Sequence, residues 1–262
     1  MGGIHPTAVL SGQVTVDPTA EVGPWCVLDG DITVGARTRL EVGVSLQGKV
    51  TLGEDNFIGA HSVIGGRPHD PAWRGEPGEV VLGRGNQIFS FVTIDRGTPR
   101  GDSRTVLGND NFVMAYTHLA HDCVLGNGCR ITSYCGIAGL CRLDDHVVIA
   151  GMVGMQQAVR VGAHAFISGM SAVTNDVLPF AIAHGTDQPT ALRGANVIGM
   201  KRHGFSREDI DIARALIARF EGQAMPFAQI LADIESAYDS AHPVVRRVLD
   251  FARAPSRSGV LR

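Results

Sequence analysis

Aliphatic residues recur at every sixth position along the first two thirds of this chain. One run extends from Ile4 to Ile64, a second extends from Leu107 to Val173, and three further positions lie between them. Of these 26 positions, only Met155 is not Leu, Ile or Val. A period of six matches neither the 3.6-residue helical repeat nor the alternation of one flat strand. The positions are Ile4, Leu10, Val16, Val22, Leu28, Val34, Leu40, Leu46, Leu52, Ile58, Ile64, Leu82, Ile88, Ile94, Leu107, Val113, Leu119, Leu125, Ile131, Ile137, Leu143, Ile149, Met155, Val161, Ile167 and Val173.

This period predicts short strands separated by turns, with three hexads in each triangular coil of eighteen residues. The aliphatic residue points into the prism, and the residue after it is often glycine, as at Gly23, Gly35 and Gly53, where the chain has to turn. Stacked coils pair their backbones in parallel about 4.8 Å apart, so each coil buries the next. We therefore expect a mainly β protein built as a parallel β-helix of about nine coils.

Two segments interrupt the hexads, and both are predicted to be projecting loops. Residues 65–81 hold a cluster of glycines and prolines with charges of both signs, and residues 95–106 contain a shorter run of the same kind. Loops that leave a rigid solenoid commonly carry function. We expect the β-helix domain to occupy residues 1–190 and to carry both loops.

The remaining segment, residues 191–262, is predicted to be a helical domain. Ser206 and Asp209 have the spacing of a capping box and precede an apolar helical face. Further helices are expected from about Pro226 and after Pro243. Helices of this kind would close the open end of the prism and protect its strand edges from other chains.

Composition and charge restrict the function classes. The chain has 262 residues, of which 44% are hydrophobic and 19% charged, a balance typical of a globular protein. It contains neither a run of about 18 apolar residues, as a membrane span requires, nor a secretory signal, so we expect a cytoplasmic protein without a membrane span. The net charge of −3 gives no reason to expect nucleic acid. Basic residues from Lys201 onward form either a solvated helical surface or a docking site for an acidic protein.

Four cysteines fall inside the hexad pattern, each two residues before an inward aliphatic. Cys123, Cys129, Cys135 and Cys141 are six residues apart, so neighbours in the series belong to different faces of the prism. A structural zinc site needs four ligands that converge on one point. We therefore interpret these cysteines as small apolar corner residues and expect no metal.

One short segment contains the most suggestive polar chemistry. His118 and His121 flank the inward Leu119, and Asp122 follows directly. The carboxylate could fix the tautomer of the His121 ring and increase its basicity, although an outward histidine on a solenoid is also often plain surface. The chain has no phosphate-binding glycine loop of the Walker type, and we expect no cofactor.

Four segments resemble one family of hexapeptide-repeat enzymes, the UDP-N-acetylglucosamine 3-O-acyltransferases that begin lipid A synthesis. They are residues 120–123 (AHDC), 75–77 (GEP), 94–98 (IDRGT) and 201–208 (KRHGFSRE). The resemblance covers nearly the whole chain, and the loops and the tail are more specific than the hexads. It implies a left-handed parallel β-helix, a homotrimer with active sites between neighbouring prisms, and transfer of a fatty acyl group, usually 3-hydroxylated, from acyl carrier protein to the 3-hydroxyl of the sugar.

The resemblance also implies roles for individual residues. His121 would be the general base, Asp122 would orient it, and the Gly139 N–H would be the oxyanion donor. Asp70 and His118 would hold the sugar. The remaining positions lie along the donor cleft, at the point that sets acyl length, or at the nucleotide end: Gln157, Gly169, Asn196, Arg202 and His203.

Six positions depart from the family pattern. Most replace a histidine, a basic residue or an acidic residue that would contact sugar or diphosphate, and Asp95 in place of histidine should repel a diphosphate. The scaffold, the base and the oxyanion glycine agree with the family, whereas acceptor recognition is expected to differ. The six positions are Ala72, Asp95, Leu140, Gln156, Ile198 and His203.

Three other functions remain open at this point. A relative with a changed acceptor could acylate an amino sugar and form an amide. A metal-dependent lyase like the γ-carbonic anhydrases could use His118, His121 and His146 as ligands, although the 25-residue interval from His121 to His146 is not a whole number of coils. A scaffold without catalytic activity is the third alternative.

Overall fold

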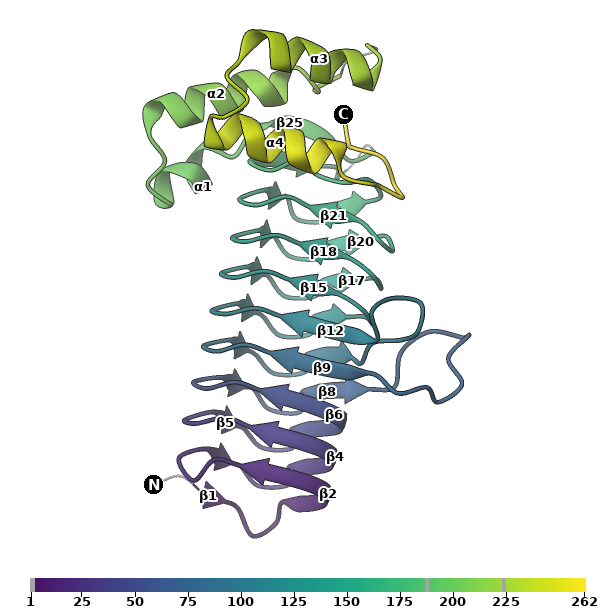
Figure 1. Ribbon diagram of the computed structural model, residues 1–262. Helices are drawn as coiled ribbons and strands as arrows, with labels where there is room; N and C mark the ends of the chain where they lie inside the picture. Colours follow the sequence, from purple (N-terminus) through teal and green to yellow (C-terminus); the bar gives the residue numbers. More distant parts are fainter. Residues whose placement is uncertain (1–2, 187–188, 223–224) are drawn as a thin grey trace.

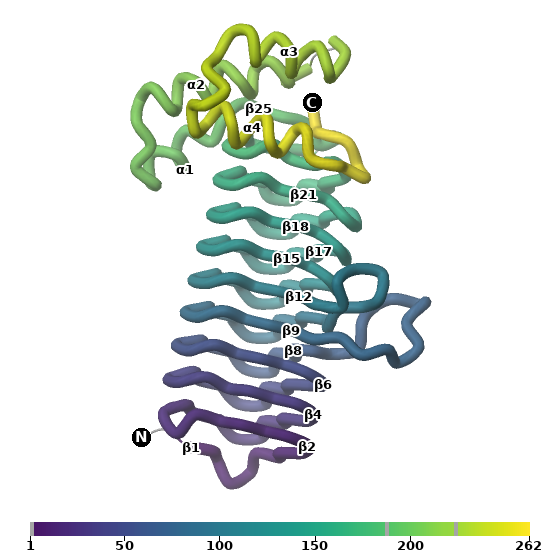
Figure 2. Tube along the Cα trace, in the orientation of Figure 1, coloured from purple at the N-terminus to yellow at the C-terminus, as the bar shows by residue number. Residues whose placement is uncertain are grey.

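The computed structural model describes residues 3–186, 189–222 and 225–262, and its main feature is a parallel β-solenoid capped by helices (Figure 1). The chain winds upward from the N-terminus in stacked coils, which the Cα trace follows without a break in direction (Figure 2). Residues one coil apart are paired at an interval of eighteen, as in Ile131↔Ile149↔Ile167. The predicted coil length and parallel stacking are confirmed.

The first face of the prism contains ten parallel strands, one from each coil, and a final antiparallel strand, β25. The solenoid therefore has about ten coils rather than the nine expected, because β24 adds a coil after the last predicted hexad. The strands are β1 (Gly3–Ile4), β3 (Glu21–Val22), β5 (Arg39–Leu40), β7 (Phe57–Ile58), β10 (Gln87–Ile88), β13 (Phe112–Val113), β16 (Arg130–Ile131), β19 (Val148–Ile149), β22 (Phe166–Ile167), β24 (Ala181–His184) and β25 (Ala191–Ala195).

The other two faces are joined near the N-terminus, where three long strands bend through the corner between them: β2 (Val9–Val16), β4 (Val27–Val34) and β6 (Ser45–Leu52). Beyond β6 each coil contributes separate strands. Those of the second face are β8 (Val63–Gly66), β11 (Thr93–Asp95), β14 (His118–Leu119), β17 (Gly136–Ile137), β20 (Gly154–Met155) and β23 (Ala172–Val173). Those of the third face are β9 (Glu79–Leu82), β12 (Arg104–Leu107), β15 (Val124–Leu125), β18 (Arg142–Leu143) and β21 (Arg160–Val161).

The core of the solenoid is the column of aliphatic side chains inside the prism. Every hexad position from Val22 to Val173 is buried, as predicted. The expectation fails in the first coil, where Ile4 and Leu10 are 45% and 39% exposed and Val16 is half-buried. Among the described residues, β1 and β2 pair with a neighbouring coil on one side only, so the other side of each residue remains in contact with solvent.

Both predicted loops leave the prism at the corner between the second and third faces. In the early coils this corner is closed by stacked glycines, and a Cβ at Gly30 would lie 2.1 Å from the Gly48 carbonyl oxygen. From β8 onward the corner opens. One insertion runs from β8 to β9 and the next from β11 to β12, and both project to the same side (Figure 1).

Helices cover the C-terminal end of the solenoid, and Ser206 and Asp209 form the predicted capping box. Arg160 donates hydrogen bonds to the buried carboxylate of Asp176 and to the Phe251 carbonyl oxygen. These bonds connect the last helix, α4 (Pro243–Arg253), to the last coils. No helix in the described ranges is long and apolar enough to cross a membrane. The helices are α1 (Val197–Arg202), α2 (Arg207–Ala218), α3 (Phe227–Ala237) and α4 (Pro243–Arg253).

The cysteines are unpaired, buried corner residues, as interpreted from the hexads. Each thiol of the series points at a backbone carbonyl fifteen residues further along, for example Cys129 at Asp144 (3.1 Å) and Cys141 at Gln156 (3.1 Å). Burial raises the pKa of both Cys129 and Cys141 to about 12. These thiols are therefore protonated and unreactive at neutral pH.

Candidate active site

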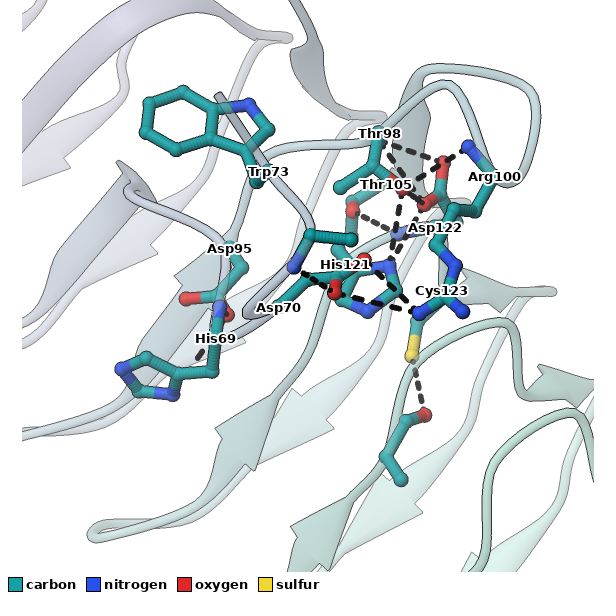
Figure 3. A network of polar contacts seen from close by, with 12 residues as sticks. His69, Asp70, Trp73, Asp95, Thr98, Arg100, Thr105, His121, Asp122 and Cys123 are labelled. Carbon is teal, nitrogen blue, oxygen red and sulfur yellow. Dashed lines mark hydrogen bonds and ion pairs between the residues drawn. The ribbon is translucent and has the colours of Figure 1, made fainter. Parts of the chain in front are cut away.

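His121 and Asp122 lie at the corner from which the two insertions depart, one coil further along the prism. They connect β14 to β15. Asp122 adopts a left-handed backbone conformation (φ 61°), which turns the chain sharply between the two faces. The insertion after β11 folds back over this corner and brings Thr98 and Arg100 against the pair (Figure 3). Both His121 and Asp122 are thereby buried.

The Asp122 carboxylate fixes the orientation of the His121 ring. Asp122 Oδ2 lies 2.8 Å from His121 Nδ1. The carboxylate also accepts hydrogen bonds from the backbone N–H of Thr98 (3.0 Å) and from its hydroxyl (2.7 Å), and the Asp122 N–H donates to Thr105 Oγ1 (2.9 Å). A carboxylate at Nδ1 places the proton on that nitrogen, so Nε2 is left with a free lone pair. The pair is thus arranged as a general base with its orienting carboxylate.

Gly139 lies against the free side of the imidazole. It occupies the equivalent corner position one coil beyond His121, and a Cβ there would lie 2.6 Å from both Nε2 and Cε1 of the ring. Within the described part of the chain, the Gly139 N–H donates to no other group. The absence of a side chain therefore leaves an amide hydrogen and a basic nitrogen at one small site, the combination that acyl transfer requires.

A cleft of about 420 Å³ opens beside His121 and is lined by four other predicted site residues, Gly139, Asp70, His118 and Gln157. The Asp70 carboxylate is held by the Ala72 N–H (2.8 Å) and by Arg100 Nη1 (3.2 Å). These two donors, the Ala72 amide above all, hold the pKa of Asp70 below its ordinary value. Asp70 is therefore a buried anionic acceptor fixed in the wall of the cleft.

His118 faces Asp95 and His69 rather than His121. His118 Nε2 and His69 Nδ1 are 3.4 Å apart, and each lies 3.8 Å from Asp95 Oδ2. Burial lowers the pKa of His118, so its ring is neutral at pH 7. His69 was not among the predicted site residues, because its loop lies outside the hexad register and spacing gives no position for it.

Three of the remaining predicted residues line a second cleft at a different corner of the prism. Asn196, Arg202 and His203 line a cavity of about 790 Å³. Helix α1, which carries Arg202, lies on the opposite side of the prism from the two loops (Figure 1). Asn196 caps α1 through the Gly199 N–H (3.0 Å) and donates to the His164 carbonyl (2.8 Å). None of these residues lines the His121 cleft.

Sequence reasoning missed Arg130 and His164 in this second cleft, and it named His146 only as a metal ligand. The rings of His146, His164 and His203 pack within 4.3–4.9 Å of one another. Burial lowers the pKa of His164 to about 4, with the neighbouring rings adding to the effect. The eighteen-residue interval from His146 to His164 could have predicted that these two histidines stack on successive coils.

His146 lies away from His121, so the lyase ligand set of His118, His121 and His146 is not assembled.

Gly169 lies apart from both clefts, at the corner between β22 and β23, where a Cβ would meet the Gly151 carbonyl oxygen at 3.2 Å. Among the departures, Leu140 stacks one coil above Asp122 and its N–H donates to the His121 carbonyl oxygen (2.9 Å). Ile198 is 66% exposed on α1.

Comparisons with known proteins agree with this architecture. Residues 176–261 match the family described as "Udp N-acetylglucosamine O-acyltransferase; Domain 2", and residues 104–139 match "Bacterial transferase hexapeptide (six repeats)". The structure resembles the UDP-N-acetylglucosamine acyltransferase of Francisella novicida (TM-score 0.95, 29% identity, 99% of this chain and 94% of that one). It also resembles the UDP-N-acetylglucosamine O-acyltransferase of Moraxella catarrhalis (TM-score 0.93, 28% identity, 99% of both chains).

Sequence similarity extends over the full length. The acyl-[acyl-carrier-protein]–UDP-N-acetylglucosamine O-acyltransferase of Paraburkholderia xenovorans is 44% identical over 265 aligned positions, which span all of both chains. The similarity extends over the whole chain in both sequence and structure, and it therefore identifies the family. The chain belongs to the UDP-N-acetylglucosamine O-acyltransferase family.

Proposed function

We propose that this protein transfers a fatty acyl group from acyl carrier protein to the 3-hydroxyl of UDP-N-acetylglucosamine, the first step of lipid A synthesis. The observation that carries the proposal is the His121 ring, whose Nδ1 is held by buried Asp122 while Nε2 faces Gly139 in an open cleft. The relative from Paraburkholderia xenovorans bears the name of this reaction. The donor is expected to carry a 3-hydroxylated chain.

The proposed mechanism uses three groups of the chain. His121 Nε2 accepts the proton of the sugar 3-hydroxyl as its oxygen attacks the thioester carbonyl. The Gly139 N–H stabilises the resulting oxyanion, a contribution of about 3 kcal/mol for one donor of this kind. Collapse of the intermediate breaks the carbon–sulfur bond, and the imidazolium returns its proton to the departing thiolate. Asp122 stabilises the imidazolium throughout.

The second face of the prism offers a path for the acyl chain. Its outward positions next to β14 are Gly136, Gly154 and Ala172, on β17, β20 and β23. A Cβ at Gly136 or Gly154 would meet nothing within 4 Å, so packing inside the chain does not require glycine there. The flat surface is instead suited to an extended hydrocarbon that runs from the His121 cleft toward Gly169.

The nucleotide would be held by the second cleft, where Arg130 and Arg202 supply positive charge for a diphosphate. Because this cleft lies at another corner of the same chain, the two halves of the site come together only if a second copy packs against the second face. A homotrimer satisfies this requirement at each of its three interfaces between subunits. Exposed, stacked rings along the edge of that face support self-association, with Phe91, Tyr116 and Tyr134 successively 5.0 Å apart.

An amino sugar remains the second candidate acceptor, and Asp95 favours it. Asp95 introduces a carboxylate beside the predicted sugar residue His118, where the family pattern has histidine. A carboxylate favours a cationic amine over a diphosphate oxygen. Acylation of an amine would give an amide in place of an ester. The cytoplasmic location stays a prediction.

The test is an acyl-transfer assay with purified protein. Acyl carrier proteins charged with several chain lengths are incubated with UDP-N-acetylglucosamine or with its 3-amino analogue, and products are followed by mass spectrometry. An acylated nucleotide that hydroxylamine cleaves, and that His121→Ala does not form, supports the ester reaction. A hydroxylamine-stable product from the amino sugar alone would move the assignment to the second candidate. No product from either acceptor would contradict the proposal.

A further inference from the structure

Three side chains next to the candidate active site converge in a way that acyl transfer does not require. His69 Nδ1, Asp95 Oδ2 and His118 Nε2 all lie within 4.8 Å of one another. Among the residues that the structure describes, this is the one group of three His, Cys, Asp or Glu side chains with such convergence. Figure 3 shows the His69 side chain just below Asp95, to the left of Asp70 and His121 in this view.

The separations match the geometry of a small transition-metal ion. They are 3.4 Å between the two ring nitrogens and 3.8 Å from each nitrogen to the carboxylate oxygen. Ligands about 2.0–2.1 Å from a tetrahedral zinc ion lie about 3.3 Å apart. Side-chain movements of a few tenths of an ångström would therefore bring all three ligand atoms to bonding distance of one ion.

The surrounding structure holds two of the three ligands in place. The Thr93 hydroxyl lies 2.7 Å from His118 Nδ1, so that Nε2 of the same ring points toward Asp95. Thr93 and His118 are paired residues of β11 and β14. A register shift between Ile94 and Asp95 turns the Asp95 carboxylate toward the loop. There, Asp95 Oδ2 accepts a hydrogen bond from the backbone N–H of His69 (3.0 Å). A hydrogen bond to the second nitrogen of a ligating histidine is the usual outer support of a metal site.

The charge balance around Asp95 also indicates a cation. Its side chain is 5% exposed, and within the described ranges its ion-pair partners are the two histidines. The Arg96 guanidinium interacts with this carboxylate only at longer range, and its Nε donates to the Gly65 carbonyl oxygen instead. A proton on one ring nitrogen can form a hydrogen bond between the two rings at 3.4 Å, but the carboxylate oxygen, 3.8 Å from each nitrogen, would then receive no hydrogen bond from either ring. One divalent ion between the three atoms satisfies all of them.

We propose that His69, Asp95 and His118 bind one divalent transition-metal ion, with zinc the best fit, and that a coordination position stays open toward the His121 cleft. Two histidines and one carboxylate with an open position form a known class of catalytic zinc site. His69 and His118 both line the cleft, so the open position can take water or an oxygen atom of the acceptor. The proposal concerns metal binding and does not depend on the acyl-transfer assignment.

The experiment titrates Co²⁺ into tag-free protein from which metals have been removed with a chelator. Co²⁺ reports its ligands through visible absorption bands, which are intense for four- or five-coordinate sites. We expect one Co²⁺ per chain, displaced by one equivalent of Zn²⁺. Asp95→Asn and His69→Ala are each expected to weaken binding at least about 100-fold, and Thr93→Val by about 10-fold through loss of the hydrogen bond to His118.

Two controls separate this site from its neighbours. His203→Ala disrupts the other histidine cluster and is expected to leave the Co²⁺ spectrum unchanged. His121→Ala is expected to bind Co²⁺ normally even if it abolishes acyl transfer, so the metal site and the proposed reaction can fail independently. Circular dichroism establishes that each variant is folded. The proposal is overturned if the wild-type protein binds no Co²⁺, or if folded Asp95→Asn binds Co²⁺ as tightly as wild type.

Discussion

Gly139 lies directly against the His121 imidazole, so closely that a Cβ on Gly139 would come within 2.6 Å of the ring nitrogen Nε2. The two residues are eighteen positions apart and occupy the same corner of successive coils. This stacking places a backbone amide next to the nitrogen that we propose receives the proton. It also makes the absence of a side chain at residue 139 a requirement of the site.

Gly139→Ala is therefore expected to lower kcat by about 10²–10³, because the methyl group displaces the ring from the reacting hydroxyl and disturbs the oxyanion donor. Steady-state kinetics with acyl carrier protein and nucleotide sugar measure the effect. Gly151→Ala is the matched control. Its Cβ would meet the Ser133 carbonyl oxygen at an ordinary 3.4 Å, and activity is expected to be retained. Wild-type activity in folded Gly139→Ala would contradict the proposed role of Gly139 as the oxyanion donor.

Thr98 is expected to act as a positioning residue through Asp122. Its hydroxyl donates to Asp122 Oδ2 at 2.7 Å, and Thr98→Val removes this bond while the backbone N–H bond stays. We expect kcat to fall about 10-fold with little change in KM, since a hydrogen bond to a charged group contributes about 1.5–3 kcal/mol. Thr98→Ser restores the hydroxyl and should recover most of the activity. Equal losses in both variants would indicate a packing role instead.

Gly169 is predicted to leave room for a long acyl chain, which a bulky side chain at this position would shorten. The methionine side chain of Gly169→Met would project at the far end of the proposed acyl path, and its Cβ needs only a small adjustment at the Gly151 carbonyl (3.2 Å). We expect kcat/KM to fall at least about 10-fold for long acyl donors and to stay unchanged for short ones, since each buried methylene contributes about 0.8 kcal/mol. Competition between donors of different length measures the ratio. If the preference for donor length is unchanged, the acyl chain does not extend to residue 169.

Arg202 is predicted to bind the nucleotide diphosphate from the second cleft. Arg202→Ala is expected to raise KM for the nucleotide sugar about 10-fold while kcat changes little, because the charge contacts bound substrate rather than the reacting atoms. Activity measured against acceptor concentration gives both constants. Arg207→Ala, at a side chain that is 97% exposed on α2, is the control and should behave as wild type. A loss confined to kcat would argue against a diphosphate contact.

His164 is predicted to make the protein less stable in acid. Burial lowers its pKa from 6.5 to about 4 in the folded chain, with further lowering from His146, His203 and Arg247. Between pH 6.5 and 4 the unfolded chain binds a proton at this ring that the folded chain does not. Stability is therefore complete above pH 6.5, falls as the pH is lowered, and shows no further change from this group below about 4.

The loss attributable to His164 is about 1–2 kcal/mol after allowance for solvent screening, and urea unfolding at a series of pH values measures it. His164→Phe preserves the stacking on Phe180, where the ring planes are 5° apart, and removes the titrating group. This variant should lose part of the acid-induced decrease in stability. Identical pH profiles for both proteins would show that His164 does not titrate in this range.

The hexad pattern determined the solenoid because the information is local and repeated. Each aliphatic residue points inward at a fixed interval, and backbone pairing at eighteen residues follows from it, as in Ile137↔Met155. Gly139 and His121 are also eighteen residues apart, but Gly139 was predicted from the family resemblance rather than from this spacing. The start of α2 could also be predicted from Ser206 and Asp209, because a capping box depends on residues close together in sequence.

Tertiary structure alone decided what the interruptions do. His69 and Asp95 are 26 residues apart, which is not a whole number of coils, and His69 lies in an insertion outside the register. Their approach depends on the path of the loop and on the register shift at Asp95, and neither leaves a periodic signal. The exposure of Ile4 and Leu10 in the first coil likewise depends on the missing neighbour rather than on the residues themselves. Periodic contacts can be predicted from spacing, whereas contacts made where the period breaks depend on how the whole chain is arranged in space.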